Sequence, residues 1–114
     1  MSDCLFCSIV QGEIPSDEVA RGEDWYAFRD IDPKAPTHVL IIPDRHIASI
    51  HDVTPDDAGL LGRMVVAARD IAEGEGIASG GYRLVWNVGS HGGQAVFHIH
   101  LHLLGGRPFA WPPG

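Results

Sequence analysis

Three histidines alternate with apolar residues close to the end of the chain, between residues 98 and 104. In a β-strand successive side chains point to opposite faces of the sheet, so side chains two positions apart share a face. The three imidazoles then lie on one face, at His98, His100 and His102. The apolar side chains lie on the other, at Ile99, Leu101 and Leu103. Because histidines two apart stand about 6.6 Å from each other along a strand, the segment predicts a strand with one packing face and one reactive face.

The length and composition indicate a single globular domain over residues 1–114. Hydrophobic residues make up 45% of the chain and charged residues 20%, which is typical of a folded protein rather than a disordered one. The formal net charge of −7 argues against binding to polymeric nucleic acid, because that role needs a basic surface. No apolar run is as long as a membrane span and the first residues lack a secretory signal, so we expect no membrane contact and a cytoplasmic location.

Both cysteines of the chain lie together near its start, as Cys4 and Cys7. In a reducing compartment this spacing favours metal or redox chemistry over a structural disulfide. Two thiolates supply only half of a tetrahedral zinc site, so histidines from elsewhere in the chain would have to complete it. Free thiols and a disulfide remain the alternatives.

The first half of the chain predicts a short helix and an antiparallel pair of strands. Asp3 is a plausible N-cap for a helix that runs to about Val10 and ends at Gly12. Strands are expected over residues 25–28 and 39–42, because two prolines in the segment between them forbid continuous regular structure there.

The second half predicts one long helix followed by two strands. Thr54 and Pro55 begin the helix, and glycines at 74 and 76 end it. Its apolar positions follow the helical period and are expected in the core: Leu60, Leu61, Met64, Val65, Ala68, Ile71 and Ala72. A strand over residues 82–88 and a glycine-rich loop over 89–93 lead into the histidine strand, and the tail from 108 is irregular. The order of elements favours an α+β domain with a mainly antiparallel sheet.

Several motifs together resemble the histidine triad (HIT) superfamily, and specifically its Hint branch of nucleoside phosphoramidases. The resemblance covers nearly the whole chain and is carried by His98–Leu104, Asp30–Pro33, Ala35–His38, Gly92–Gln94, Leu104–Arg107 and Trp111–Gly114. The last of these segments is the branch-specific one, because the triad by itself indicates only a nucleotide hydrolase or transferase. The resemblance implies a HIT-like fold and a homodimer whose tail reaches toward the partner's active site.

The resemblance also assigns the catalytic roles. His100 is the nucleophile, which attacks the α-phosphorus and forms a covalent nucleotidyl-histidine. His102 hydrogen-bonds the phosphate, and main-chain N–H groups from Gly93 to Val96 donate to its oxygens. His98 is the third catalytic histidine, and no metal ion is needed for the chemical step.

The nucleoside site follows from the same resemblance. Phe6, Ile9 and Phe28 clamp the base, with His38 beside them. Three further residues contact other parts of the substrate: Asp30 the ribose hydroxyls, Asn87 the phosphate and leaving group, and Trp111 the partner subunit's pocket. Hint relatives carry a serine where this chain has Ala95, so we expect weaker protonation of the departing amine.

In some members of the superfamily a structural zinc ion is held by residues that match Cys4, Cys7, His46 and His98. The rival hypotheses place a catalytic metal on His98, His100 and His102, or leave these three as a solvated polar strand face. His51 and His91 are expected to be solvated.

The expected activity is cleavage of purine nucleoside 5′-phosphoramidates to release the nucleoside monophosphate, with acyl-adenylates as a further candidate substrate class. Two alternatives stay open at this point. One is a dinucleoside polyphosphate hydrolase, and the other is a nucleotide-binding or protein-interaction module with little turnover.

Overall fold

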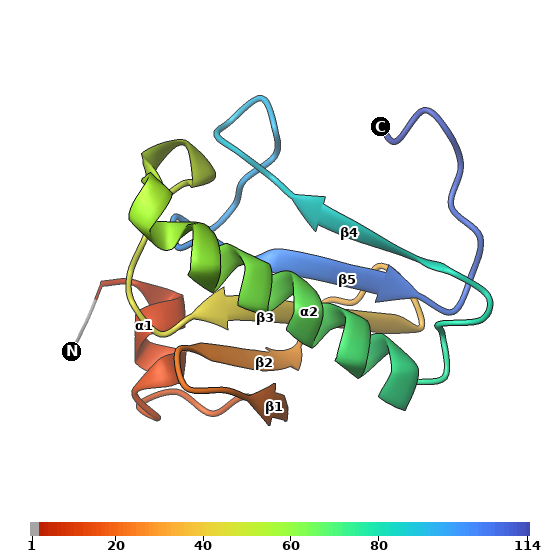
Figure 1. Cartoon of the computed structure of the whole chain (residues 1–114), viewed down its shortest axis with the longest axis horizontal. Helices are drawn as coiled ribbons and strands as arrows, with labels where there is room; N and C mark the ends of the chain where they lie inside the picture. The colour runs from red at the N-terminus through yellow and green to blue at the C-terminus, as the bar shows by residue number, and fades with distance from the viewer. Residues whose placement is uncertain (1–2) are drawn as a thin grey trace.

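The computed structural model describes residues 3–114, whose strands form a five-stranded antiparallel sheet in the order β1-β2-β3-β5-β4. Figure 1 shows the long helix α2 lying across one face of this sheet and the short helix α1 at one end of it. The bounds of the elements are α1 Leu5–Val10, β1 Glu18–Arg21, β2 Trp25–Arg29, β3 Thr37–Pro43, α2 Ala58–Gly74, β4 Tyr82–Trp86 and β5 Leu101–Gly105. The predicted α+β class with a mainly antiparallel sheet is confirmed.

Strand β3 is the centre of the sheet, and all seven of its residues are buried. It pairs with β2 on one side, as expected, with Trp25 opposite Pro43 and Arg29 opposite Val39. On its other side it pairs with β5, the strand that carries His102. The central position explains the nearly continuous apolar sequence of β3, because a strand covered on both faces has no solvent side.

The two faces of the sheet carry separate cores. One is packed under α2 and includes Ala27, Val39, Ile41, Leu101 and Leu103. The other, which we call the site face, is the face covered by α1 and consists of Phe6, Ile9, Tyr26, Phe28, Leu40 and Ile42. Alternate residues of β2 and β3 contribute to opposite cores, as the two-residue period of a strand requires.

The predicted helix start at Thr54 and Pro55 is a 3₁₀ turn over Pro55–Asp57, and α2 itself begins at Ala58. The N–H of Thr54 donates to Asp57 Oδ2 at 2.9 Å, which satisfies a main-chain donor at the helix start. Most of the expected core positions are buried, but Val65 is 39% exposed and Ala67 is buried instead. Val65 lies about 100° around the helix axis from Met64, which turns it away from the sheet.

Two features near the N-terminus differ from expectation. Cys4, rather than Asp3, is the N-cap of α1, and its Sγ accepts a hydrogen bond from the N–H of Cys7 at 3.3 Å. Strand β1 was not predicted, because its short sequence lacks an apolar alternation and its ends are exposed. It is an edge strand whose pairing with β2 is irregular between Glu18 and Ala20.

The histidine segment is a strand only from Leu101 onward. The register that pairs Ile41 with Leu101 would next place Pro43 opposite Ile99, and a proline has no N–H to continue the ladder. Ile99 instead donates its N–H to the carbonyl oxygen of Ile47 at 2.8 Å. The side chains of the segment nevertheless alternate between the two faces of the sheet, and Ile99 and Leu101 are buried in the core that is packed under α2.

Strand β4 is also shorter than predicted, because Asn87 and Val88 lie beyond its end at Trp86. His51 and His91 are exposed, as expected. Within residues 3–114 no helix has both the length and the apolar character needed to cross a bilayer.

Candidate active site

His100 lies at the inner wall of a cavity on the site face and is 7% exposed. Its Nδ1 donates to the main-chain oxygen of His98 at 2.9 Å. A neutral imidazole carries one proton, so this bond leaves the lone pair on Nε2. Burial lowers the pKa of His100 below its usual value, which favours the neutral form. His100 is therefore held as a neutral ring with its Nε2 available as a nucleophile.

A chain of hydrogen bonds fixes the tautomer of His102. The N–H of Lys34 donates to His38 Nδ1 at 3.0 Å, so the proton of a neutral His38 is on Nε2. That Nε2 lies 2.9 Å from His102 Nδ1 and 3.4 Å from Asp30 Oδ2. His102 Nδ1 is thus an acceptor, and the proton of His102 is on Nε2.

Both of these rings are kept neutral by their surroundings. Burial lowers the pKa of His102 to about 4, and repulsion from His100 and His38 adds to the effect. Burial also lowers the pKa of His38, although the nearby Asp30 carboxylate opposes this change. The assigned tautomers are consequently those present at neutral pH.

His102 Nε2 is buried and has no hydrogen-bond partner within residues 3–114. A buried donor without a partner destabilises a fold by about 1–3 kcal/mol, so such groups are usually satisfied by water or a ligand. This donor belongs to a residue that lines the same cavity as His100. Its position suits a ligand that offers an acceptor oxygen next to the nucleophile.

The cavity has a volume of about 770 Å³ and lies between α1, β2, β3 and the segment that precedes β5. Its wall is mainly apolar, with polar groups that include His100, His102 and Asp30. The lining residues are Leu5, Phe6, Ile9, Ile14, Pro15, Ser16, Asp17, Phe28, Arg29, Asp30, Ile31, Leu40, Ala95, Val96, His100 and His102. A mainly apolar cavity with a few polar groups on its wall is typical of a site for a small organic ligand.

The segment before β5 also brings main-chain N–H groups to the cavity. The N–H groups of Gly93 and Gln94 are used within their own loop, by Ser90 and Gly89 respectively. The N–H groups of Ala95 and Val96 donate to no group in the described part of the chain. The expected donor set of Gly93 to Val96 is therefore reduced to its last two members, which both line the cavity.

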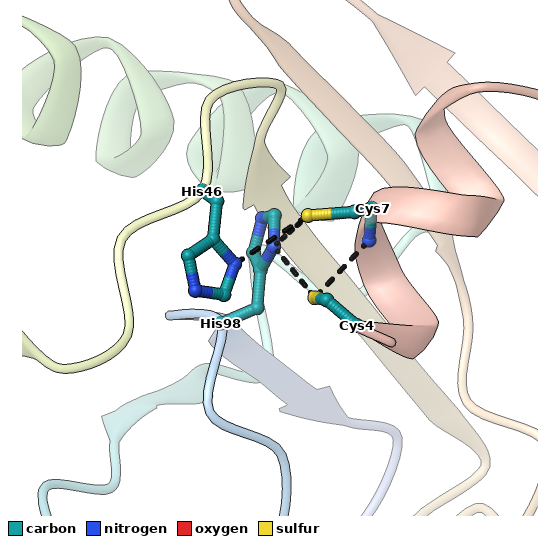
Figure 2. A group of neighbouring side chains, drawn as sticks. All are labelled: Cys4, Cys7, His46 and His98. Atoms are coloured by element: carbon teal, nitrogen blue, oxygen red, sulfur yellow. Dashed lines mark hydrogen bonds between the residues drawn. The ribbon is translucent and has the colours of Figure 1, made fainter. Parts of the chain in front are cut away.

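A second cluster joins both cysteines to two histidines (Figure 2). His98 Nδ1 lies 3.3 Å from Cys4 Sγ and 3.4 Å from Cys7 Sγ. His46 Nδ1 lies 3.4 Å from Cys7 Sγ. The ligand atoms of all four residues are within 4.8 Å of one another.

The geometry of this cluster fits a tetrahedral zinc ion. Ordinary Zn–S and Zn–N bonds at a tetrahedral angle separate a sulfur from a nitrogen by roughly 3.5 Å, close to the separations found here. His98 Nε2 donates to the carbonyl oxygen of Pro43 at 2.8 Å, which leaves the Nδ1 lone pair directed at the sulfurs. Such a carbonyl partner is common for a histidine that binds a metal.

Comparisons with known proteins identify relatives of this chain. Residues 3–108 match the family model described as "Scavenger mRNA decapping enzyme C-term binding". The chain is 54% identical over 106 residues to the purine nucleoside phosphoramidase of Escherichia coli K12, an alignment that covers 93% of this chain and 89% of that protein. A solved HIT family hydrolase from Legionella pneumophila is 58% identical, with a TM-score of 0.96, and covers 98% of this chain and 100% of its own.

The chain belongs to the histidine triad (HIT) family. The expected family membership is thereby confirmed. A HIT family hydrolase from Clostridium thermocellum superposes with a TM-score of 0.93 at 44% identity, and each chain is 96% covered. Together these relatives show that this HIT protein is a hydrolase.

The fold of this HIT protein brings most of the predicted site residues to one cavity. The lining includes Phe6, Ile9, Phe28, Asp30, Ala95, Val96, His100 and His102. His38 lies behind His102 and contacts it directly. Three predicted residues do not line the cavity: Asn87, Gly93 and Trp111. Trp111 is 82% exposed in the tail.

Several apolar residues of the cavity in this HIT protein were not predicted from the sequence. Leu40 could have been found from the strand period, because it must face away from Val39 and Ile41 and so belongs to the site face. Ile14 and Leu5 line the cavity from either end of α1, and no sequence signal distinguishes them from ordinary core residues.

The three triad histidines do not form a metal site among the described residues of this HIT protein. The ring of His98 is directed at the cysteines and Pro43, whereas the Nδ1 of His100 is bonded to a carbonyl. Another group with ligand atoms close together is Asp30, His38 and His102. There, however, both His38 nitrogens and His102 Nδ1 already have hydrogen-bond partners.

Proposed function

We propose that this HIT protein cleaves purine nucleoside 5′-phosphoramidates and releases the nucleoside monophosphate. The observation that carries the proposal is the neutral His100, with its free Nε2 beside the unpartnered donor of His102 in an apolar cavity. The name of the E. coli relative, purine nucleoside phosphoramidase, supports the choice of substrate class.

The chemistry begins at His100. Its Nε2 lone pair attacks the α-phosphorus, a new phosphorus–nitrogen bond forms to the ring, and the bond to the leaving amine breaks as the amine gains a proton. Water then attacks the nucleotidyl-histidine, giving the monophosphate and restoring the neutral ring. As the new bond forms, positive charge develops on the ring, and the His98 carbonyl that accepts from Nδ1 stabilises it.

Three donors are suited to hold the phosphate. His102 Nε2 offers one N–H, and the main chain at Ala95 and Val96 offers two more. All three are positioned before the substrate binds, so little reorganisation is required as charge develops on the phosphoryl oxygens. We assign these groups, with His100, as the phosphoryl-transfer machinery.

The apolar wall of the cavity suits a purine. Phe6 and Phe28 meet edge to face with ring centroids 5.5 Å apart, and Ile9 completes the wall. Asp30 also lines the cavity, where its carboxylate can accept from ribose hydroxyls. Its Oδ1 already accepts from the N–H of Asp32 at 2.8 Å, which fixes the carboxylate in place.

We also propose a structural zinc ion on Cys4, Cys7, His46 and His98. The ion would fasten α1, which supplies Phe6 and Ile9 to the cavity, to the segment that carries His100. The four protein ligands leave no open position for substrate, which is the arrangement of a structural site rather than a catalytic one.

A homodimer is the third element of the proposal. Strand β4 is an edge of the sheet, and all five of its residues are half-buried although its outer side has no partner in the described chain. An unpaired edge of this kind readily accepts a strand of a second copy. Sedimentation velocity should give twice the 12.3 kDa mass of the chain, and a monomer would count against this element.

The central test is hydrolysis of adenosine 5′-phosphoramidate, followed as release of AMP. Wild type and a His91→Ala control should release AMP, and His100→Ala should not. Quenching with alkaline denaturant during turnover should trap adenylate on the peptide that contains His100, because a phosphorus–nitrogen bond to histidine is stable to alkali and labile to acid. Binding of AMP without turnover would instead favour a nucleotide-binding module, and cleavage of dinucleoside polyphosphates alone would favour the other hydrolase class.

A further inference from the structure

The tail that follows β5 turns back on the loop between β2 and β3. Gly106 has a φ of +92°, a conformation that favours glycine, and a Cβ at this position would lie 2.8 Å from Pro36 Cβ. The close approach of these two segments places Arg107 beside residues 30–36. That loop also carries Asp30, one of the two acids that line the cavity.

The side chain of Arg107 is held by main-chain oxygens and an aromatic ring. Its Nη2 donates to the carbonyl oxygen of Lys34 at 2.9 Å, and its Nη1 donates to that of Pro108 at 3.0 Å. The guanidinium carbon lies 4.3 Å from the centre of the Phe109 ring. Within residues 3–114 it has no carboxylate partner, so its strongest directional contact with the body of the protein is Lys34.

The main-chain N–H of Lys34 begins the chain of hydrogen bonds that fixes the tautomer of His102. This N–H donates to His38 Nδ1, His38 Nε2 donates to His102 Nδ1, and His102 is left with its proton on Nε2. Arg107 binds the carbonyl of the same residue whose N–H begins this chain of hydrogen bonds. The residues are far apart in sequence, and only the fold connects them.

We propose that Arg107 is a positioning residue for His102. By holding Lys34, it keeps the Lys34 N–H on His38 Nδ1 and so maintains the Nε2–H tautomer of His102 at the cavity. The proposal rests on the proposed function in one respect, which is that the group bound by the His102 Nε2–H donor is the phosphate of the substrate. The control of the tautomer itself requires no substrate.

A simpler role for Arg107 would be to anchor the tail. Arg83 provides the comparison, because its guanidinium also lies over Phe109, at 5.2 Å, and its Nη2 donates to the carbonyl of Ala110 at 3.0 Å. Arg83 therefore holds the tail without bonding to Lys34 or any other residue of the loop. Removing each arginine in turn separates tail anchoring from control of the histidines.

The experiment compares Arg107→Met, which keeps the length of the side chain but removes its donors, with Arg83→Met and Arg107→Lys. The protein is labelled with ¹⁵N-histidine, and long-range ¹H–¹⁵N correlation spectra report which nitrogen of His102 carries the proton. Wild type and Arg83→Met should show the Nε2–H form. Arg107→Met should show a mixture of tautomers, and Arg107→Lys should restore part of the Nε2–H population.

Turnover of adenosine 5′-phosphoramidate gives a second readout. Arg107→Met should lower kcat roughly fivefold to tenfold, which corresponds to the loss of about one hydrogen bond. Its KM should stay within about twofold of the wild-type value. An unchanged tautomer in Arg107→Met would overturn the proposal, as would equal effects of Arg107→Met and Arg83→Met. If wild type failed to release AMP, the proposed function would fail, while the spectra would still decide the role of Arg107.

Discussion

His98 supports the ring of His100 through its main chain while its own ring belongs to the cysteine cluster. The carbonyl oxygen of His98 accepts from His100 Nδ1 at 2.9 Å, and His98 Nδ1 lies 3.3 Å from Cys4 Sγ. The proposed metal site and the proposed nucleophile are thus connected by a single residue. A change at the cysteines should therefore be detectable at His100.

Replacing a proposed zinc ligand should lower both metal content and stability. We expect Cys4→Ser to lose about one zinc ion per chain. A ligand present at a hundred times its Kd stabilises a fold by about 2.7 kcal/mol, so the Tm should fall by roughly 10–15 °C. Metal analysis and thermal unfolding measure the two effects. A chelator should lower the Tm of wild type but leave that of Cys4→Ser unchanged; a variant that keeps its zinc would contradict the proposed ligand set.

Removing the donor of His102 should slow turnover more than it weakens binding. The N–H on Nε2 meets charge that develops during phosphoryl transfer, and loss of one such donor typically costs roughly 10²- to 10³-fold in kcat. His102→Ala should show this loss with adenosine 5′-phosphoramidate, and His102→Gln, which retains an amide donor, should lose less. His91→Ala is the matched histidine control. A loss confined to KM would show that His102 acts only in binding.

Stability should fall as the pH decreases below about 6.5. Burial lowers the pKa of His102 from 6.5 to about 4, with further repulsion from His100 and His38 and a smaller opposing effect of Asp30. Between these two pKa values the unfolded chain binds more protons than the folded one, so the free energy of unfolding rises with pH. His102 contributes at most about 3 kcal/mol, fully present above pH 6.5 and lost as the pH approaches 4.

Urea unfolding at pH 7.5 and pH 5.0 tests this dependence. The difference between the two pH values should be smaller in His102→Gln than in wild type, because the glutamine does not titrate. Equal pH dependence in the two proteins would mean that His102 is not the group responsible. The lowered pKa of His38 acts in the same direction and remains in both proteins.

Restoring a hydroxyl at position 95 should speed the release of amines. Ala95 is exposed and lines the cavity, so a serine can be accommodated without repacking. One added hydrogen bond to the leaving nitrogen corresponds to a roughly fivefold increase in kcat. We expect Ala95→Ser to gain this for adenosine 5′-phosphoramidate, with Ala110→Ser as the control for an alanine outside the cavity. No gain would show that another group, or water, already protonates the amine.

Local sequence patterns were sufficient for much of the fold. The two-residue alternation around His100 correctly placed Ile99 and Leu101 in the core, because the direction of a side chain in an extended segment depends only on its parity. The position at which the ladder begins could not be derived in this way. It depends on Pro43, a residue of another strand, whose missing N–H ends the pairing at Leu101.

Edges and helix faces were less well predicted. Strand β1 has no apolar alternation, because an edge strand with exposed ends has no buried face that would require one. Val65 was expected in the core from the helical period, but the direction from which the sheet meets α2 decides which of two adjacent positions is covered.

The sequence by itself determined that three histidines share one face, that two cysteines share one helical turn, and that an antiparallel sheet carries a long helix. These properties follow from backbone periodicity over a few residues. Only the tertiary structure decided that His98 turns its ring to Cys4, that His38 sets the tautomer of His102, and that Arg107 binds Lys34. Each of these contacts joins segments more than 60 residues apart, so it depends on how strands pair and loops close rather than on any local pattern.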